Sequence, residues 1–234
     1  MKVGVYVDGY NLYYGGRSLC GKDVTGWKWL NIRQLIEPYA AWGGAALDRI
    51  VYCTARVNDP DQDSFLNALI HFGAVDEIIE GHYVSWAREK PLVEGDPRTK
   101  APNLFRMDVD EVLPPALPLR ITPDESVLAL VRIREEKGSD VNVASHLLRD
   151  TYTNQIDAAI VVSNDSDLGR PLNFARAEIP VGTINPQKAY LAGALRGVAS
   201  EGAGRHWWKQ LQPRDFIENQ LPDQVGVWRK PSDW

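Results

Sequence analysis

The chain has 234 residues, and its apolar fraction of 44% and charged fraction of 24% are ordinary for a globular protein, which argues against disorder, collagen and coiled coil. Its formal net charge of −5 gives no overall attraction to polyanions, so nucleic-acid binding requires a local basic patch or a cation. Two cysteines are too few for a disulfide framework or a four-thiolate zinc site, and the cytoplasm is the expected location. No apolar run approaches the roughly 18 residues that span a bilayer, so we expect no membrane partner.

Strands and helices alternate over the first third of the chain. The predicted elements are a strand over 2–7, a helix over 31–42, a strand over 47–54, a helix from residue 60 onwards and a strand over 75–84. The run Asp8-Gly9-Tyr10-Asn11, directly after the first strand, has the composition of a turn. Asp59 and Pro60 fit the N-cap and the first position of the second helix. Alternation of this kind indicates a parallel sheet covered by helices.

The regular pattern fails between residues 86 and 125, where prolines are frequent, and we predict a long irregular insertion there. The elements predicted beyond it are a strand over 126–134, a helix capped by Ser139 and ending at about 152, a strand over 156–162, a helix over 167–177, a strand over 179–184, and short helices over 190–198 and 213–219. This order predicts one α/β domain over 1–221 with an insertion at about 86–125, followed by a C-terminal tail over 222–234.

Aspartates follow the ends of two predicted strands. Asp8 comes directly after the first strand, whereas Asp165 and Asp167 follow the strand over 156–162. Asp140 opens the helix that begins at Ser139. Because the carboxyl ends of parallel strands meet at one edge of a sheet, where ligands bind, we expect these four side chains to converge. Each close pair of carboxylates repels by about 1–4 kcal/mol, and a hard cation such as Mg²⁺ or Mn²⁺ removes that repulsion.

Each aspartate also has a purely structural explanation. Asp140 and Asp167 taken singly fit helix caps, and Asp8 fits a turn. The run from Ser163 to Asp167 contains more polar residues than capping needs. The joint placement of the four aspartates therefore favours a metal site over four separate caps.

The same residues resemble the NYN domain, a branch of the PIN-like metal-dependent nucleases. The matching segments are Tyr6-Val7-Asp8-Gly9-Tyr10-Asn11, Lys137-Gly138-Ser139-Asp140-Val141 and Val162-Ser163-Asn164-Asp165-Ser166-Asp167-Leu168. The resemblance implies a PIN-like three-layer sandwich, with a central mainly parallel sheet flanked by helices, and phosphodiester hydrolysis assisted by magnesium or manganese. Asn164 stands where many relatives carry glycine, which narrows the approach to Asp165.

The resemblance also implies roles for individual residues. By position, Asp8, Asp140, Asp165 and Asp167 become the catalytic and metal-binding residues. We assign Asp8 and Asp165 as the primary ligands, and we expect Asp140 and Asp167 to hold metal-bound waters or a second ion. Asn11 and Ser163 become substrate-contacting groups or supports for the ligands. Lys137, just before Asp140, is a candidate phosphate contact, although a solvated surface lysine explains it equally well.

Further substrate contacts are predicted in the insertion and after the first strand. Arg98, Lys100 and Arg106 lie in the insertion near Trp86 and Phe105, a combination of cations and aromatic rings that suits single-stranded nucleic acid. A solvated loop with two anchoring aromatics is the alternative. Tyr10, Tyr13 and Tyr14 follow Asp8 and are expected to line the cleft, with at least one of them in the core.

The leading hypothesis from the sequence is a nuclease that uses Mg²⁺ or Mn²⁺ to hydrolyse single-stranded RNA. The alternative is a non-catalytic NYN-domain protein that binds RNA or another protein in a regulatory role. A phosphatase with paired aspartates is disfavoured because Gly9 and Tyr10 follow Asp8, where such enzymes place a second aspartate. DNA as a substrate and assembly into a homo-oligomer are left open.

Overall fold

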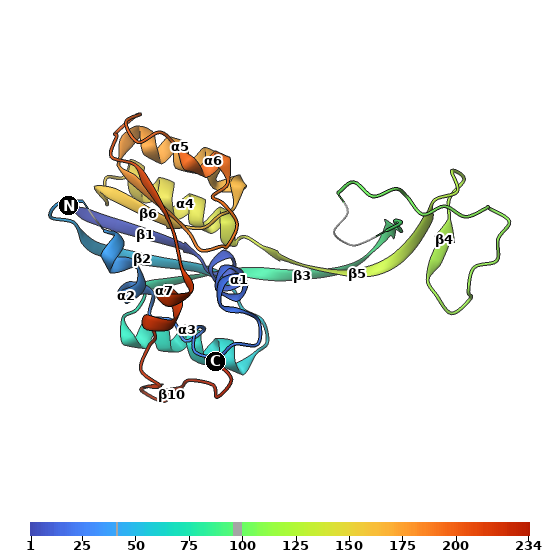
Figure 1. Ribbon diagram of the computed structural model, residues 1–234, viewed down its shortest axis with the longest axis horizontal. Helices are drawn as coiled ribbons and strands as arrows, with labels where there is room; N and C mark the ends of the chain where they lie inside the picture. Colours follow the sequence, from blue (N-terminus) through green and yellow to red (C-terminus); the bar gives the residue numbers. More distant parts are fainter. Residues whose placement is uncertain (41, 96–99) are drawn as a thin grey trace. The chain divides into compact units, whose positions relative to one another are not determined.

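The computed structural model describes residues 1–40, 42–95 and 100–234, and its centre is a sheet with the strand order β4-β5-β3-β2-β1-β6-β7-β8 (Figure 1). The strands are β1 (Lys2–Asp8), β2 (Ala46–Ala55), β3 (Glu77–Pro91), β4 (Leu119–Ile121), β5 (Val127–Lys137), β6 (Ala158–Val162), β7 (Val181–Asn185) and β8 (Trp207–Gln210). Neighbours from β3 through β2, β1, β6 and β7 to β8 pair in parallel, and β4 pairs with β5 in antiparallel. The predicted α/β class with a mainly parallel central sheet is confirmed.

Helices cover both faces of this sheet (Figure 1). One face carries α4 (Ser139–Tyr152), α5 (Gly169–Glu178) and α6 (Gly193–Arg196), and the other carries α1 (Gly9–Cys20), α2 (Ile32–Ile36), α3 (Pro60–Phe72) and α7 (Pro213–Glu218). Alternate residues of β1 feed the two cores, because Val5 and Val7 pack with α1 to α3 whereas Tyr6 packs with α4 and α5. The fold is therefore the three-layer sandwich expected from the sequence. None of the described helices is long and apolar enough to cross a membrane.

Short elements complete the chain. They are the 3₁₀ helices η1 (Glu37–Tyr39) and η2 (Ser166–Leu168), and the strands β9 (Gln224–Val225) and β10 (Trp228–Arg229), which pair with each other in antiparallel. The segment over 222–234, expected as a tail, thus contains a small hairpin, and it contacts α3.

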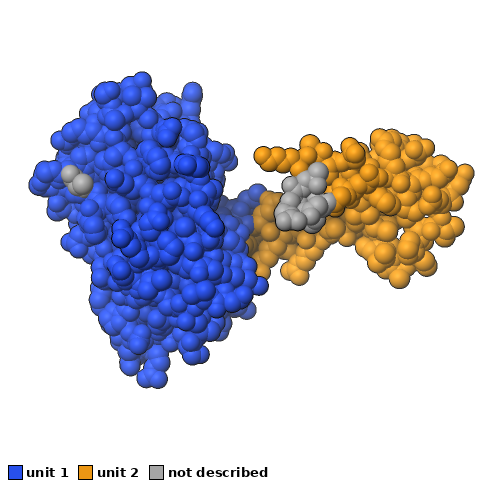
Figure 2. Space-filling view, in the orientation of Figure 1, with its two compact units in different colours: residues 1–82, 136–234 blue, residues 83–135 orange. Residues whose placement is uncertain are grey.

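The chain divides into two compact units, coloured separately in Figure 2. The first unit comprises residues 1–82 and 136–234, and it holds all the helices named above. The second comprises residues 83–135, and it holds β4, the end of β3 and most of β5. The segment expected to be irregular, over 86–125, lies within this second unit.

The turn predicted at Asp8-Gly9-Tyr10-Asn11 is wrong, because α1 begins at Gly9 immediately after the strand. Asp8 is its N-cap and accepts the N–H of Asn11 at 2.9 Å. Two glycines, Gly15 and Gly16, weaken the helical signal of this segment. Packing explains them: a Cβ added at Gly15 would lie 2.3 Å from the carbonyl oxygen of Pro186, so only glycine permits this approach.

Two other local expectations are also wrong. Gly138, not Ser139, is the N-cap of α4, and the Ser139 hydroxyl instead donates to Glu136 Oε1 at 2.8 Å. The strand β8 was not expected, because adjacent tryptophans do not show the alternation of a half-buried strand. It forms because Gly182 on β7 leaves room for the Trp207 ring, which would lie 2.2 Å from an added Cβ.

A buried carboxylate ties α4 to the sheet. Asp150 is fully buried on α4 and accepts hydrogen bonds from the Tyr6 hydroxyl at 2.9 Å and from Arg149 Nε at 2.8 Å. Arg49 on β2 lies 3.4 Å from the same carboxylate and also pairs with Glu77 on β3. Two guanidinium groups and a phenol thus compensate the buried charge. Burial, and then the negative charge of Asp150, raise the pKa of Tyr6.

Replacement of Asp150 by Ala should be severely destabilising, because it leaves the Tyr6 hydroxyl and two cations without their acceptor. The free energy of unfolding, measured by urea denaturation, should fall by about 3–5 kcal/mol. The control Asp157→Ala removes an exposed carboxylate that accepts the Lys2 N–H at 2.7 Å. It should cost about 1 kcal/mol or less. Equal losses in the two variants would contradict the structural role of the buried network.

Candidate active site

The centre of the candidate site is the carboxylate of Asp8, at the carboxyl end of β1. Its side chain is held from two sides, because Asn11 N–H donates to Oδ1 at 2.9 Å and the Ser163 hydroxyl donates to Oδ2 at 3.0 Å. Asp8 is only 4% exposed, and Ser163 is fully buried. The Ser163 oxygen in turn accepts the N–H of Asp165 at 3.1 Å. The ends of β1 and β6 are thus joined through one buried acid.

Asp8 has an unusual affinity for protons. Burial raises the pKa of its carboxyl from the ordinary 3.8 to about 6. The hydrogen bonds from Asn11 and Ser163 lower this pKa, whereas the negative charges of Asp165 and Glu136 raise it. The carboxyl therefore changes its charge close to neutral pH, which makes it suited to proton transfer.

The other predicted acids occupy different positions. Asp165 is the N-cap of η2 and accepts the N–H of Asp167 at 3.0 Å, so its carboxylate has a structural use. Asp167 is exposed on η2, and Asp140 lies half-buried in the first turn of α4, which contacts η2. Within residues 1–40, 42–95 and 100–234, no group of three or more His, Cys, Asp or Glu side chains could hold a metal ion. The four aspartates do not form such a group, and binding of Mg²⁺ or Mn²⁺ stays a prediction.

A network of side-chain amides extends from Asn11, the residue whose N–H binds Asp8, and most of its members were not predicted from the sequence. Asn11 Oδ1 accepts the N–H of Asn164 at 3.0 Å and the Nε2 of Gln187 at 2.8 Å. Asn164 in turn accepts the N–H of Ala192 at 2.7 Å and donates to the carbonyl oxygen of Tyr190 at 3.1 Å. The residue that stands where many NYN relatives carry glycine therefore anchors the segment after β7.

Two further amides fix the start of that segment. Asn185, the last residue of β7, is fully buried, donates to the Ala189 carbonyl at 2.7 Å and accepts the Gln187 N–H at 2.8 Å. Gln210 on β8 donates to the Gln187 carbonyl at 2.8 Å. Asp8 and Asp165 were predicted as site residues because polar residues at the carboxyl end of a parallel strand often bind ligands. The same pattern at the end of β7 indicates Asn185 and Gln187.

The predicted substrate-contacting cations lie apart from this network in the sequence. Lys137 ends β5, two residues before α4. Arg106 lies in the second unit, where it donates to the carbonyl oxygen of Asp124 at 2.8 Å, and Lys100 is exposed in the same unit. Arg98 lies outside the residues that the structure describes. Contact of these four cations with a substrate stays a prediction.

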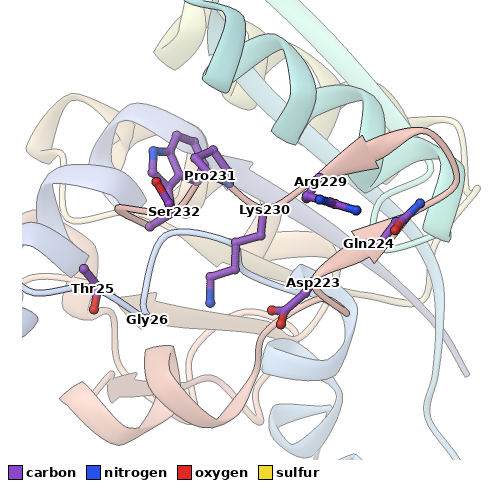
Figure 3. A pocket seen from close by; sticks show the side chains of 9 residues that line it. Thr25, Gly26, Asp223, Gln224, Arg229, Lys230, Pro231 and Ser232 are labelled. Atoms are coloured by element: carbon purple, nitrogen blue, oxygen red, sulfur yellow. The ribbon is translucent and has the colours of Figure 1, made fainter.

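A separate open pocket of about 560 Å³ lies in the first unit (Figure 3). Its lining consists of Thr25, Gly26, Asp223, Gln224, Arg229, Lys230, Pro231, Ser232 and Trp234. The pocket is lined by the loop after α1 and by the chain around the hairpin of β9 and β10, and none of the predicted site residues that the structure describes contributes to it.

No protein-family model matches the chain. The chain is 28% identical over 260 aligned residues to the 6-hydroxy-3-succinoylpyridine 3-monooxygenase HspA of Pseudomonas putida. This alignment covers 99% of this chain and 73% of HspA. A crystal structure of a Vibrio parahaemolyticus protein of unknown function has a TM-score of 0.48 at 13% identity, covering 90% of this chain and 93% of that one.

The similarity to a monooxygenase overturns the predicted nuclease. The prediction of an RNA-hydrolysing enzyme rested on aspartates at strand ends, whereas the relative that spans almost the whole chain carries the name of an oxygen-inserting enzyme. The relative is an enzyme, which agrees with the expectation that this chain is one. Its name does not support hydrolase activity. The NYN resemblance, an RNA partner and a homo-oligomer stay predictions.

The raised pKa of Asp8 predicts a specific dependence of stability on pH. Because the pKa of Asp8 is higher in the folded chain than in the unfolded chain, protonation of Asp8 stabilises the folded state. This contribution to the free energy of unfolding is complete below pH 3.8, the ordinary pKa, and is lost as the pH rises through about 6. The loss should be about 3 kcal/mol. Asp8→Asn removes this titration, so urea denaturation of both proteins between about pH 4 and about pH 7 should show the wild type losing more stability. Parallel pH profiles would show that Asp8 does not titrate in this range.

The amide network predicts that Asn164 holds the segment after β7 in place. Asn164→Ala removes the acceptor of the Ala192 N–H, so hydrogen exchange at that amide should accelerate about tenfold or more. Asn173→Ala is the control, because Asn173 accepts a hydrogen bond from Arg176 on its own helix at 3.3 Å and therefore does not hold the segment after β7. Unchanged exchange at Ala192, measured by NMR or mass spectrometry, would mean that other contacts hold this segment.

Proposed function

We propose that this chain is a monooxygenase that acts on a small hydroxylated aromatic compound, with its reaction centred on Asp8. The observation that carries the proposal is the similarity to HspA, which at 28% identity extends over 99% of the chain and so includes every segment of the candidate site. A hydroxypyridine that carries an acidic side chain is the substrate class that this relative's name suggests.

The reaction must balance oxygen, electrons and protons. One atom of O₂ enters the aromatic substrate, and the other leaves as water after taking up two electrons and two protons. The electrons come from an external two-electron donor, such as a reduced nicotinamide or a reduced flavin. The residues of this chain are assigned only to binding and to proton transfer.

Asp8 is the proposed proton acceptor. A ring hydroxyl that loses its proton makes the ring richer in electrons, which favours attack by an electrophilic oxygen species. A base does this best when its pKa lies near the working pH, and burial raises the pKa of Asp8 to about 6. The Ser163 hydroxyl, 3.0 Å from Oδ2, and the Asn11 N–H, 2.9 Å from Oδ1, fix the direction of the carboxylate.

Oxygen uptake with 6-hydroxy-3-succinoylpyridine as the probe substrate tests this proposal, with a reduced nicotinamide and a reduced flavin supplied in separate assays. Wild-type kcat/KM, which reports the ionisation of the free enzyme, should rise with pH through about 6 and then level off, because the base must be ionised. Asp8→Asn should lower kcat by about 10²-fold or more and remove this pH dependence.

The matched control is Asp48→Asn, the same change at an exposed residue of β2. It should retain wild-type kcat and its pH profile. Absence of substrate-dependent oxygen uptake with both donors would overturn the proposed activity. Full activity of Asp8→Asn would leave the activity in place but remove Asp8 from it.

A further inference from the structure

The outer face of α1 carries three exposed tyrosines directly after Asp8. Tyr10, Tyr13 and Tyr14 are 44%, 42% and 42% exposed, although large aromatic side chains bury much apolar area when they pack inward. A contiguous aromatic patch on a protein surface often marks a binding site. Because α1 begins at Gly9, the patch starts within the first turn of the helix that Asp8 caps.

The tyrosine rings hold one another in place. The ring centroids of Tyr10 and Tyr14 are 4.6 Å apart, and those of Tyr13 and Tyr14 are 5.2 Å apart with an edge-to-face arrangement. Tyr13 also contacts Trp27 at 5.6 Å, which connects the patch to the core. Rings braced in this way lose little conformational freedom when a flat ligand stacks on them.

A cation lies at the end of this patch. The guanidinium of Arg17 is 5.8 Å from the centroid of the Tyr14 ring. Arg17 is half-buried one turn further along α1, and no described carboxylate forms an ion pair with it. A guanidinium beside an aromatic face suits a ligand that combines a ring with a carboxylate.

We propose that Tyr10, Tyr14 and Arg17 form the substrate-docking face of the Asp8 site and that this face takes a planar aromatic acid. The ligand ring stacks on the two tyrosines, and a side chain of a few carbon atoms carries its carboxylate to Arg17. This inference rests on the proposed function, because it assigns the same substrate to the same site. It adds the residues that select an acidic ring over a neutral one.

A single-stranded nucleic acid is a weaker fit to this face. Such a ligand also stacks its bases on aromatic side chains, but it requires several cations along its backbone. All residues of α1 are described, and Arg17 is their one cation. On a chain with a net charge of −5, that single guanidinium matches one carboxylate better than a polyanion.

Binding measured by calorimetry without reductant tests the inference separately from turnover. The probes are 6-hydroxy-3-succinoylpyridine and the uncharged 2-hydroxypyridine. Arg17→Gln should weaken binding of the acid about tenfold or more and change binding of the neutral ring less than about twofold. Tyr14→Leu should weaken both ligands by about threefold to tenfold.

The control variants are Arg170→Gln and Phe174→Leu. They alter an equivalent exposed pair on α5, in which the guanidinium lies 5.5 Å from the ring centroid, and they should bind both probes as wild type does. Circular dichroism confirms that each variant is folded.

The outcomes separate this inference from the proposed function. If the acid binds through Arg17 and Tyr14 but no oxygen is consumed, the docking face stands and the monooxygenase proposal fails. If oxygen uptake occurs but both α1 variants bind and turn over the acid like wild type, the docking face is wrong. Absence of acid binding to the wild type, or displacement of the acid by a short single-stranded RNA, would also overturn it.

Discussion

The hydrogen bond from the backbone N–H of Asn11 to the Asp8 carboxylate, 2.9 Å long, joins β1 to α1, the helix that follows it. β1 lies between β2 and β6, so the residue that ends it is screened from water, and Asp8 is 4% exposed. The carboxylate stabilises α1 as its N-cap, whereas burial disfavours its charge. The atoms that connect sheet and helix are thus the same atoms that titrate near neutral pH, and α1 must begin where the candidate site lies.

Amide side chains connect the strand ends next to this acid. An amide offers both donors and acceptors, so Asn11, Asn164 and Gln187 can connect the ends of β1, β6 and β7 without mutual repulsion. Asn185 and Gln210 extend the same pattern to β8. These hydrogen bonds hold the segment after β7 near the ends of β1 and β6. The Asn164 side chain binds the backbone of that segment, which a glycine at position 164 could not do.

Aspartates at the carboxyl edge of a parallel sheet are compatible with several chemistries, which is why the predicted nuclease was wrong while the predicted fold was correct. The four acids were expected to share a cation. In the structure Asp8 is buried and hydrogen-bonded to Ser163, and Asp165 caps η2. A buried carboxyl with a raised pKa is suited to proton transfer, which several kinds of enzyme use.

The sequence by itself determined the elements whose signals are local. β1, β2 and β6 followed from apolar β-branched runs, and α3 followed from its Asp59 cap and Pro60. Strand ends also placed Asp8 and Asp165 at one edge. Only the tertiary structure decided the features that depend on distant partners. Gly15 lies in a helix because Pro186 packs against it, and β8 exists because Gly182 accommodates Trp207. The contact of Asn11 with Gln187 joins residues 176 positions apart, a pairing that no local pattern encodes.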